Sequence, residues 1–591
     1  MAEHIAPPQA HPGTTAERPA VRDRLAARPG LLVLFAYLAA AAGLTWRLWA
    51  GLGTVSVAGD PGPADNDLMA WFMRYAAGAV AHGHLPALVS TGLNAPRGFP
   101  LMWNNSVLFP AVVLAPVTLL AGPLASLTVL TTAGYAGSAA AMYWLLRRNG
   151  ASVAAGAIGG AVFGFSPGMV NAGLGHYGMQ FAVLTPLMTE AVVAIITGRG
   201  SAVLAGTRLG LLAAAQLYIG EEMLVDVATV CLVLTVVLAA SRPREVAAAL
   251  GRAAAGLSVG AAVALVLCGY GLWVQFHGPL TEYGTPWDIA IHGNSFGSFV
   301  NPQSQLLFHT ASSAAYAASH QASYAEYLAY LGPPLLVLVA GATIWFWRDL
   351  RVRCAGVVWV VLEALSLGVN GTLLPFHWLQ AVPMFGDMLP SRMSLLAAAA
   401  AAAVLAFGLD LARPAQPRTA GPLRRLAPAA VAVLAVLPLV PRPVAAPAGS
   451  KVPPGWTTVF TRLQLPPGAS VLVVPLPYSH QGDAMLWQAD TGQPASLVAG
   501  WFLGPNGSGH GDDAWWGPGT IHQTVECVDA LWRGDPADSG CAADLSAALR
   551  YWHPGAVVAD ASPQSPEGRF LIGVLGPPAV RDAALLGWRT G

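Results

Sequence analysis

Three carboxylates stand close together in the stretch GDPGPADNDLMAW: Asp60, Asp65 and Asp67. Their density is unusual because only 10% of the 591 residues are charged. A carboxylate can take a proton from a substrate hydroxyl and so act as a general base. A structural interpretation is the alternative: Asp60 precedes a Pro-Gly turn, and Asp65 and Asp67 open an amphipathic helical pattern that they could cap.

Three cationic side chains near apolar segments could hold a phosphate group. Arg74 lies in the helical pattern that follows the aspartates, His176 stands in GLGHYG after an apolar segment, and Arg392 opens another one. Guanidinium and imidazolium groups bind phosphate oxygens through charge-assisted hydrogen bonds. The alternatives are a structural hydrogen bond for His176 and, for Arg392, an interfacial anchor paired with Asp387.

Two further pairs of residues are candidates for a site. Glu221 and Glu222 begin an apolar helical segment, so they are either acid partners of the aspartates or helix-start acids stabilised by the macrodipole. Trp515 and Trp516 stand beside two aspartates. Their ring faces could stack on an acceptor sugar, although tryptophans of this kind are more often part of a core.

The composition indicates a polytopic α-helical membrane protein. The chain is 55% hydrophobic and its mean hydropathy is +0.53, which is too apolar for a soluble protein of this length. Its 30 basic residues balance 30 acidic ones and form no long run. This balance argues against a nucleic acid partner, which would need clustered positive charge.

Eleven apolar segments approach the length of about 20 residues that a membrane span needs. The first begins at Leu31, after a polar segment 1–30 that contains four arginines, and is predicted to be a signal anchor with a cytoplasmic N-terminus. The ten others lie near residues 124–146, 151–167, 178–196, 203–220, 222–240, 254–274, 328–347, 354–369, 393–412 and 426–442.

Arginine clusters after alternate spans set the predicted orientation. All five clusters fall on the cytoplasmic side if the eleven segments cross, which places the loops 51–105 and 276–327 and the C-terminus outside. One more apolar segment, 106–122, is short, contains two prolines and is predicted to be re-entrant or interfacial. An arrangement of twelve or thirteen spans is the alternative. The transmembrane domain is predicted to cover residues 31–442.

Residues 443–591 differ in composition and predict an α/β domain outside the membrane. ASVLVVPLP and GAVVAD read as buried strands, and DLSAALRYW reads as a short helix. Cys527 and Cys541 could form a disulfide if this domain faces an oxidising compartment, but their spacing alone does not decide it.

A series of segments between about residues 30 and 440 resembles the bacterial, actinobacterial-like GT-C membrane glycosyltransferases. The first outer loop combines GD after the first span, a Trp-containing helix and NAPRGFPLMWNNS. The later segments are FGFSPGMVNAGLGH, AQLYIGEE, YLAYLGPPLL and LPFHWLQAVPMFGDMLPSRMS. No single segment is specific by itself, so the resemblance depends on the series.

The resemblance implies a bundle of about eleven to thirteen transmembrane helices with an active site on the outer face. It implies a sugar donor on polyprenyl phosphate, and it matches Asp60 to the catalytic acid that follows Gly in the first outer loop. Asp65 and Asp67 match more variable acids. The inserted PGPA stretches the family's spacing and leaves the partner of Asp60 undecided. Some relatives hold Mg or Mn, for which Asp60 and Asp67 would be the ligands here.

The predicted function is the transfer of a hexose or pentose from a polyprenyl-phosphate donor to a cell-envelope glycan, lipid or protein, by a multi-pass protein of the bacterial cytoplasmic membrane. Such an inverting transfer needs one carboxylate base, because lipid phosphate is already a good leaving group. The alternatives are a transporter or flippase of envelope precursors and a non-catalytic assembly protein with a GT-C-like shell. A transporter should carry ionisable groups in mid-membrane, whereas these acids stand at the outer ends of spans.

Overall fold

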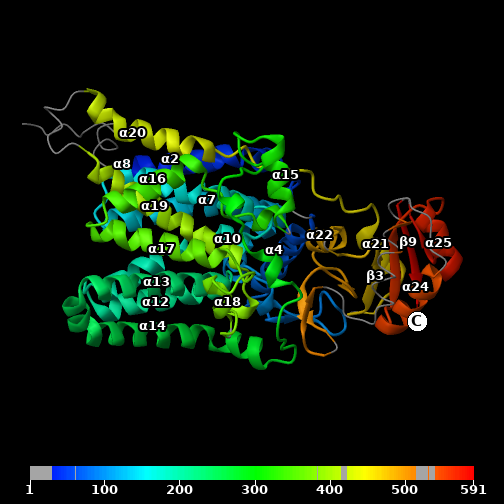
Figure 1. The fold of residues 1–591 in the computed structure, drawn as a ribbon. Helices are drawn as coiled ribbons and strands as arrows, with labels where there is room; N and C mark the ends of the chain where they lie inside the picture. The colour runs from blue at the N-terminus through cyan, green and yellow to red at the C-terminus, as the bar shows by residue number, and fades with distance from the viewer. Residues whose placement is uncertain are drawn as a thin grey trace, which may run out of the picture.

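A bundle of helices forms one end of the molecule, and a smaller domain of strands and helices forms the other (Figure 1). The predicted fold class, a polytopic helical bundle with a C-terminal α/β domain, is confirmed. The computed structural model describes residues 29–59, 62–321, 323–382, 384–413, 422–466, 468–478, 480–506, 508–513, 527, 530–531, 540–582 and 584–590.

Each of the eleven segments predicted to cross the membrane contains a helix. Helices are expected there because a helix satisfies its backbone hydrogen bonds internally, which a segment in lipid must do. The helices are α2 (Pro29–Leu44), α7 (Pro123–Arg148), α8 (Val153–Gly164), α11 (Leu184–Ile196), α12 (Ala202–Leu217), α13 (Glu222–Ser241), α14 (Pro243–His277), α16 (Pro333–Trp345), α17 (Leu350–Ser366), α19 (Met393–Leu411) and α20 (Pro422–Val436).

Four helical segments in the described part of the chain are long and apolar enough to cross a membrane by themselves: Val153–Ala172, Glu222–Ser241, Pro243–His277 and Pro390–Leu411. Five further apolar helices are shorter, at 10–17 residues. Together with the bundle architecture, these helices make the chain a membrane protein. Its orientation in the membrane stays a prediction.

Helix α19 lies at the centre of the bundle and carries the alanine run 397–403. Small side chains let neighbouring backbones approach closely, and a Cβ on Gly159 of α8 would lie only 3.0 Å from the carbonyl oxygen of Ala402. Helices α16 and α17 also pack on α19. These contacts hold the start of α19, at Met393, in the middle of the bundle end that faces the C-terminal domain.

The predicted amphipathic helix after the first span is α4 (Ala64–Ala81), and it is buried rather than exposed on one face. Twelve of its 18 residues are buried, because the bundle covers one side of it and α22 (Asp483–Asp490) of the C-terminal domain covers another. The segment 106–122 forms two short helices, α5 (Leu108–Val113) and α6 (Ala115–Ala121). Both pack on α4. Neither has the length of a membrane span.

Short elements fill the remaining loops at this end of the bundle. A hairpin of two strands follows α4, and a set of short helical turns connects the longer helices. They are β1 (Val89–Ser90), β2 (Phe99–Pro100), η1 (Leu101–Trp103), α9 (Pro167–Ala172), α10 (Tyr177–Gln180), η2 (Ile289–His292), η3 (Phe296–Phe299), α15 (Ala311–Ser319), η4 (Tyr324–Glu326), α18 (Pro375–Leu379), η5 (Phe385–Asp387) and η6 (Pro390–Arg392); α3 (Trp46–Ala50) and η7 (Leu437–Leu439) flank the bundle.

The C-terminal domain contains a five-stranded mixed sheet. The strand order is β4-β3-β7-β9-β8, with β3 parallel to β4 and β7 and with β9 antiparallel to β7 and β8. The two strands and the helix read from the sequence are β3 (Ser470–Val474), β7 (Ala556–Asp560) and α24 (Cys541–Trp552). The other elements are β4 (Ser496–Leu497), β8 (Val580–Arg581), β9 (Leu585–Arg589), the hairpin β5 (Leu503–Pro505) and β6 (Gly511–Asp513), α21 (Trp456–Arg462) and α25 (Pro566–Leu575).

A disulfide within this domain and a hydrogen bond to α4 hold parts of it in place. Cys527 and Cys541 form a disulfide, with Cα atoms 5.7 Å apart, so the pairing that the sequence left undecided is made. The indole N–H of Trp71 in α4 donates to Oε1 of Gln488 in α22 at 2.6 Å. The second link ties the C-terminal domain to the first loop of the bundle.

Candidate active site

Arg392 lies at the centre of a group of charged side chains at the bundle end that faces the C-terminal domain. Its Nε donates to both carboxylate oxygens of Glu326, at 3.1 and 3.0 Å, and its terminal nitrogens donate to Glu222 and Glu326. The side chains of Arg392, Glu222 and Glu326 are only 12%, 13% and 4% exposed. Three charges thus meet in a largely buried place, where their attraction is weakly screened.

His176 connects this group to the loop 51–105, which contains Asp65. Its Nδ1 lies 3.2 Å from Oε1 of Glu326, and its Nε2 lies 3.6 Å from Oδ2 of Asp65. Burial alone would lower the pKa of His176, but Glu326 and Asp65 raise it to about 9. Burial would raise the pKa of Glu326, but Arg392 and His176 lower it. At neutral pH the histidine is therefore an imidazolium and the glutamate a carboxylate.

A glycine allows Asp65 and His176 to meet. Gly175 has a φ of +145°, and a Cβ at this position would lie 3.1 Å from the Cβ of Asp65. Both the positive φ and the close approach of this turn to α4 favour glycine at this position. We call the five residues Asp65, His176, Glu222, Glu326 and Arg392 the ionic cluster.

The two glutamates predicted as acid partners point to different neighbours. Glu222, in the ionic cluster, also accepts the backbone N–H of Leu389 at 3.3 Å. Glu221 accepts a hydrogen bond from Gln275 of α14 at 2.8 Å. One turn beyond Glu222 on the same face of α13, Asp226 is fully buried, and neither of its carboxylate oxygens has a hydrogen-bond partner among the described residues.

The two acids of α4, Asp65 and Asp67, also face different neighbours. Asp65 accepts the indole N–H of Trp501 at 2.6 Å and faces His176. Asp67 is 3% exposed and faces α22, where a Cβ on Gly482 would lie 2.3 Å from its Oδ2. Burial raises the pKa of Asp67 well above its usual range, and the neighbouring Asp483 raises it further. Residues two apart on a helix face different directions, so only Asp65 joins the cluster.

Of the three cations predicted to hold a phosphate group, two lie together. His176 and Arg392 share Glu326 as a partner. Arg74 lies in the contact between α4 and the C-terminal domain, where its guanidinium adjoins Gly492 and weakens the effect of burial on the pKa of Asp490.

The overall structure is similar to two solved membrane transferases. Against the arabinofuranosyltransferase AftD from Mycobacteria the TM-score is 0.54, with 17% identity over 95% of this chain and 40% of that one. The chain has the GT-C fold. Against the oligosaccharyltransferase of Archaeoglobus fulgidus in its apo form the TM-score is 0.50, with 11% identity over 90% of this chain and 69% of that one. No family model and no curated protein matches the sequence.

The GT-C likeness concerns the fold, because both identities are low. The chain spans only 40% of the length of AftD. What this GT-C chain does must therefore be argued from its own residues.

Three predicted site residues of this GT-C chain, Asp60, Trp515 and Trp516, lie outside the described residues. The backbone is described up to Gly59 and again from Gly62, and a Cβ on Gly59 would lie 2.1 Å from the carbonyl oxygen of Gly62. Among the described residues, no three His, Cys, Asp or Glu side chains are arranged to hold a metal ion. Asp60, one of the two predicted ligands of Mg or Mn, lies outside the described residues, so the metal stays a prediction, and no step below depends on it.

Two residues of the site are not predicted by the sequence. Glu326 stands directly before an apolar segment in a chain that has few acids. Glu222 is predicted as a site residue from this same pattern, so the pattern could also have indicated Glu326. Trp501 carries no such signal, because its contact with Asp65 joins residues 436 positions apart.

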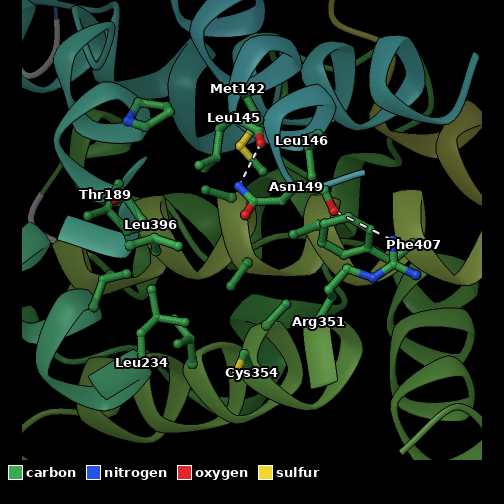
Figure 2. A pocket seen from close by; sticks show the side chains of 18 of the residues that line it. Met142, Leu145, Leu146, Asn149, Thr189, Leu234, Arg351, Cys354, Leu396 and Phe407 are labelled. Atoms are coloured by element: carbon green, nitrogen blue, oxygen red, sulfur yellow. Dashed lines mark hydrogen bonds between the residues drawn. The ribbon is translucent and has the colours of Figure 1, made fainter. Parts of the chain in front are cut away.

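A largely apolar cavity of about 270 Å³ lies within the bundle (Figure 2). Helices α13 and α19 run from the ionic cluster to the cavity. Val230 follows Asp226 by four residues on α13, and Leu396 follows Arg392 by four residues on α19. The helix faces that carry the charges therefore continue as walls of the cavity. Arg351 lines its opposite end. The remaining walls come from α7, α11 and α17.

Proposed function

We propose that this protein transfers a sugar from a polyprenyl-phosphate donor to a cell-envelope glycan, lipid or protein at the outer face of a bacterial cytoplasmic membrane. The observation that carries the proposal is the ionic cluster, in which an imidazolium and a guanidinium lie together beside an acid of the first outer loop, in a chain with the GT-C fold. A carboxylate can act as the base for the acceptor hydroxyl, and cations can stabilise the departing lipid phosphate.

The cations of the ionic cluster stabilise the phosphate leaving group. As the bond between the anomeric carbon and the phosphate oxygen breaks, its electron pair and the negative charge pass to the phosphate. The positive charges of His176 and Arg392 stabilise this charge in a largely buried site. Glu222 and Glu326 hold Arg392 in place, so that it does not have to reorganise during the reaction.

A carboxylate of the first outer loop takes the proton of the acceptor hydroxyl while the acceptor oxygen bonds to the anomeric carbon. We assign this role to Asp60, on its resemblance to the GT-C loop acid. Asp65 is the acid partner: it lies 3.6 Å from His176 and holds the imidazolium toward the leaving phosphate. Asp67, which faces α22, has no part in this step.

The cavity supports a lipid-linked donor. Its walls are mostly apolar side chains, and they continue the helix faces below Arg392 and Asp226. Apolar walls suit the hydrocarbon chain of such a donor, which otherwise lies among lipid tails of similar polarity. A donor whose phosphate lies at the cluster could place the first part of its polyprenyl chain in this cavity.

One observation favours the alternative of a transporter. Asp226 is a buried carboxylate without a described hydrogen-bond partner in a helix able to cross the membrane, and such residues often mark transport pathways. A transporter would move a lipid-linked sugar across vesicles without breaking the bond to phosphate. Sugar transfer and lipid translocation can therefore be measured separately on the same vesicles.

The test uses the purified full-length protein with polyprenyl phosphates that carry radiolabelled arabinofuranose, mannose or glucose, and with a cell-envelope fraction as acceptor. We expect transfer by the wild type and a loss of about 100-fold or more for Asp60→Asn, the range typical of a lost general base. Asp65→Asn should lose about tenfold or more. Glu245→Gln is the matched control, because Glu245 is 69% exposed and pairs with Arg242 at the other end of the bundle.

Two results would contradict the proposal. Wild-type turnover in Asp60→Asn would exclude Asp60 as the general base. Translocation of the donor without transfer of its sugar, for all three sugars, would favour the transporter.

A further inference from the structure

Trp501 brings the C-terminal domain into contact with the ionic cluster. Trp501, in the segment between β4 and β5, donates its indole N–H to Oδ1 of Asp65 at 2.6 Å. The other oxygen, Oδ2, lies 3.6 Å from Nε2 of His176. The two oxygens of Asp65 therefore each face one partner, and the carboxylate plane is set by both.

The backbone around Trp501 is held on the first outer loop of the bundle. The N–H of Leu503 donates to Oδ1 of Asn104 at 2.6 Å, and Nδ2 of Asn104 donates back to the carbonyl of Leu503 at 2.9 Å. The ring of Phe502 packs on that of Phe99 at 4.7 Å between centroids. The contacts of Phe502 and Leu503 with the first outer loop therefore fix the position of Trp501 beside Asp65.

The same segment of the C-terminal domain is also tied to the large outer loop. The N–H of Tyr283 donates to the carbonyl of Gly509 at 3.1 Å, and the N–H of Gly511 donates to the carbonyl of Tyr283 at 2.8 Å. Residues 501–506 and 508–511 therefore lie between the loop that contains Asp65 and the loop that leads to Glu326.

We propose that Trp501 is a positioning residue of the active site, which holds Asp65 so that its second oxygen faces His176, and that the C-terminal domain thereby completes the site. The inference deepens the proposed function and rests on it, because it gives Asp65 its orientation in that reaction. An indole N–H is suited to this role, since it is a rigid donor that cannot accept a hydrogen bond. Without it the carboxylate can rotate away from the imidazolium.

The expected consequence concerns the proton on His176. The charged groups that face this imidazole are Asp65, Glu326 and Arg392, and His292 lies near enough for its charge to interact with that of His176. A carboxylate that no longer faces the ring stabilises the imidazolium less, so the histidine should lose its proton at a lower pH. A change that only loosened the C-terminal domain would lower the yield of folded protein and leave this titration where it was.

Trp501→Phe keeps an aromatic ring and removes the N–H. We expect kcat to fall about tenfold and the alkaline limb of the rate profile to move to lower pH. Trp588→Phe is the matched control: Trp588 also lies in the C-terminal domain and donates its indole N–H, at 2.8 Å, to the carbonyl of Gly576. This control should keep the wild-type rate and profile. Trp501→His, which restores an N–H donor, should recover part of the rate.

A second measurement does not depend on turnover. NMR of protein labelled at histidine, with His176 assigned by His176→Gln, should show its titration shifted to lower pH in Trp501→Phe and unchanged in Trp588→Phe. In the background of Asp65→Asn, the change at Trp501 should have no further effect on the rate or the titration.

The results separate the two proposals. An unchanged titration of His176 and an unchanged rate in Trp501→Phe, while Asp65→Asn loses turnover, would overturn the role of Trp501 and leave the proposed function standing. Wild-type turnover in both Asp60→Asn and Asp65→Asn would overturn the site itself, and the catalytic role of Trp501 with it.

Discussion

Arg392 and Glu326 form a forked contact, in which Nε of the arginine lies 3.1 and 3.0 Å from the two carboxylate oxygens while a terminal nitrogen also donates to the glutamate. Only the planar guanidinium offers donors at this spacing. A second terminal nitrogen reaches Glu222. The arginine therefore holds a loop acid and a helix acid in one plane at the centre of the site.

Arg392→Lys should keep the positive charge and lose this geometry. An ammonium is a point charge that cannot bond both glutamates in the same way, so we expect turnover to fall about 100-fold and stability by about 1–3 kcal/mol, the range for lost hydrogen bonds to charged groups. Rates and thermal unfolding in detergent would measure both effects.

The matched control for this change is Arg242→Lys. Arg242 and Glu245 are 53% and 69% exposed, and an exposed pair contributes only about 0–1 kcal/mol. Equal losses in the two variants would show that the forked contact has no special role.

The proton on His176 should limit activity at high pH. Because neighbouring carboxylates raise the pKa of His176 to about 9, the imidazolium is present at neutral pH and is lost as the pH rises through about 9. Glu326→Gln removes the carboxylate that raises this pKa most, so the alkaline limb of the rate profile should move toward lower pH. A profile of log kcat between pH 6 and 10 measures the shift. An alkaline limb at the same pH in both proteins would exclude His176 as the group responsible.

The ends of the helices could be predicted from the sequence better than the contacts among the loops. His176 and Arg392 stand out because a charge beside an apolar segment is costly and rare, and the arginine clusters after alternate spans predict that both lie at the same end of the bundle. The contact of Trp501 with Asp65 could not be predicted, because it depends on how a separate domain docks on α4.

Arg74 shows a second limit of the sequence. Its position in an amphipathic pattern indicates a charged face, and the prediction directed that face toward a phosphate group. In the structure α4 is covered on two sides, by the bundle and by α22. A helix that is buried between two domains presents polar residues to both, and hydrophobic periodicity does not tell which side faces which neighbour. Arg74 faces the C-terminal domain.

The cavity in the bundle should set the preference for donor chain length. Ala400 lines it, so Ala400→Phe would fill part of the space that we assign to the polyprenyl chain. Displaced methylene groups lose their packing in the cavity and return to the lipid, and we expect KM for a long-chain donor to rise severalfold with little change in kcat. A donor with a short prenyl chain should be affected less.

Val433→Phe is the control for this variant, because Val433 lies on α20 and is 62% exposed. It should leave KM unchanged for donors of both lengths. Equal KM changes for the short and the long donor in Ala400→Phe would argue against the cavity as the site of the chain.

The disulfide between Cys527 and Cys541 offers a test of both stability and orientation. Its closed loop has a sequence separation of 14, for which the loss of chain entropy on cross-linking predicts a contribution of about 3 kcal/mol. Replacing both cysteines by Ser should therefore lower the unfolding temperature of the C-terminal domain, and a reductant should lower it in the wild type and not in the double variant. Disulfides persist outside the cytoplasm. Accordingly, Cys541→Ser should leave Cys527 open to a membrane-impermeant maleimide added to intact cells, and labelling only after the cells are permeabilised would place this domain in the cytoplasm.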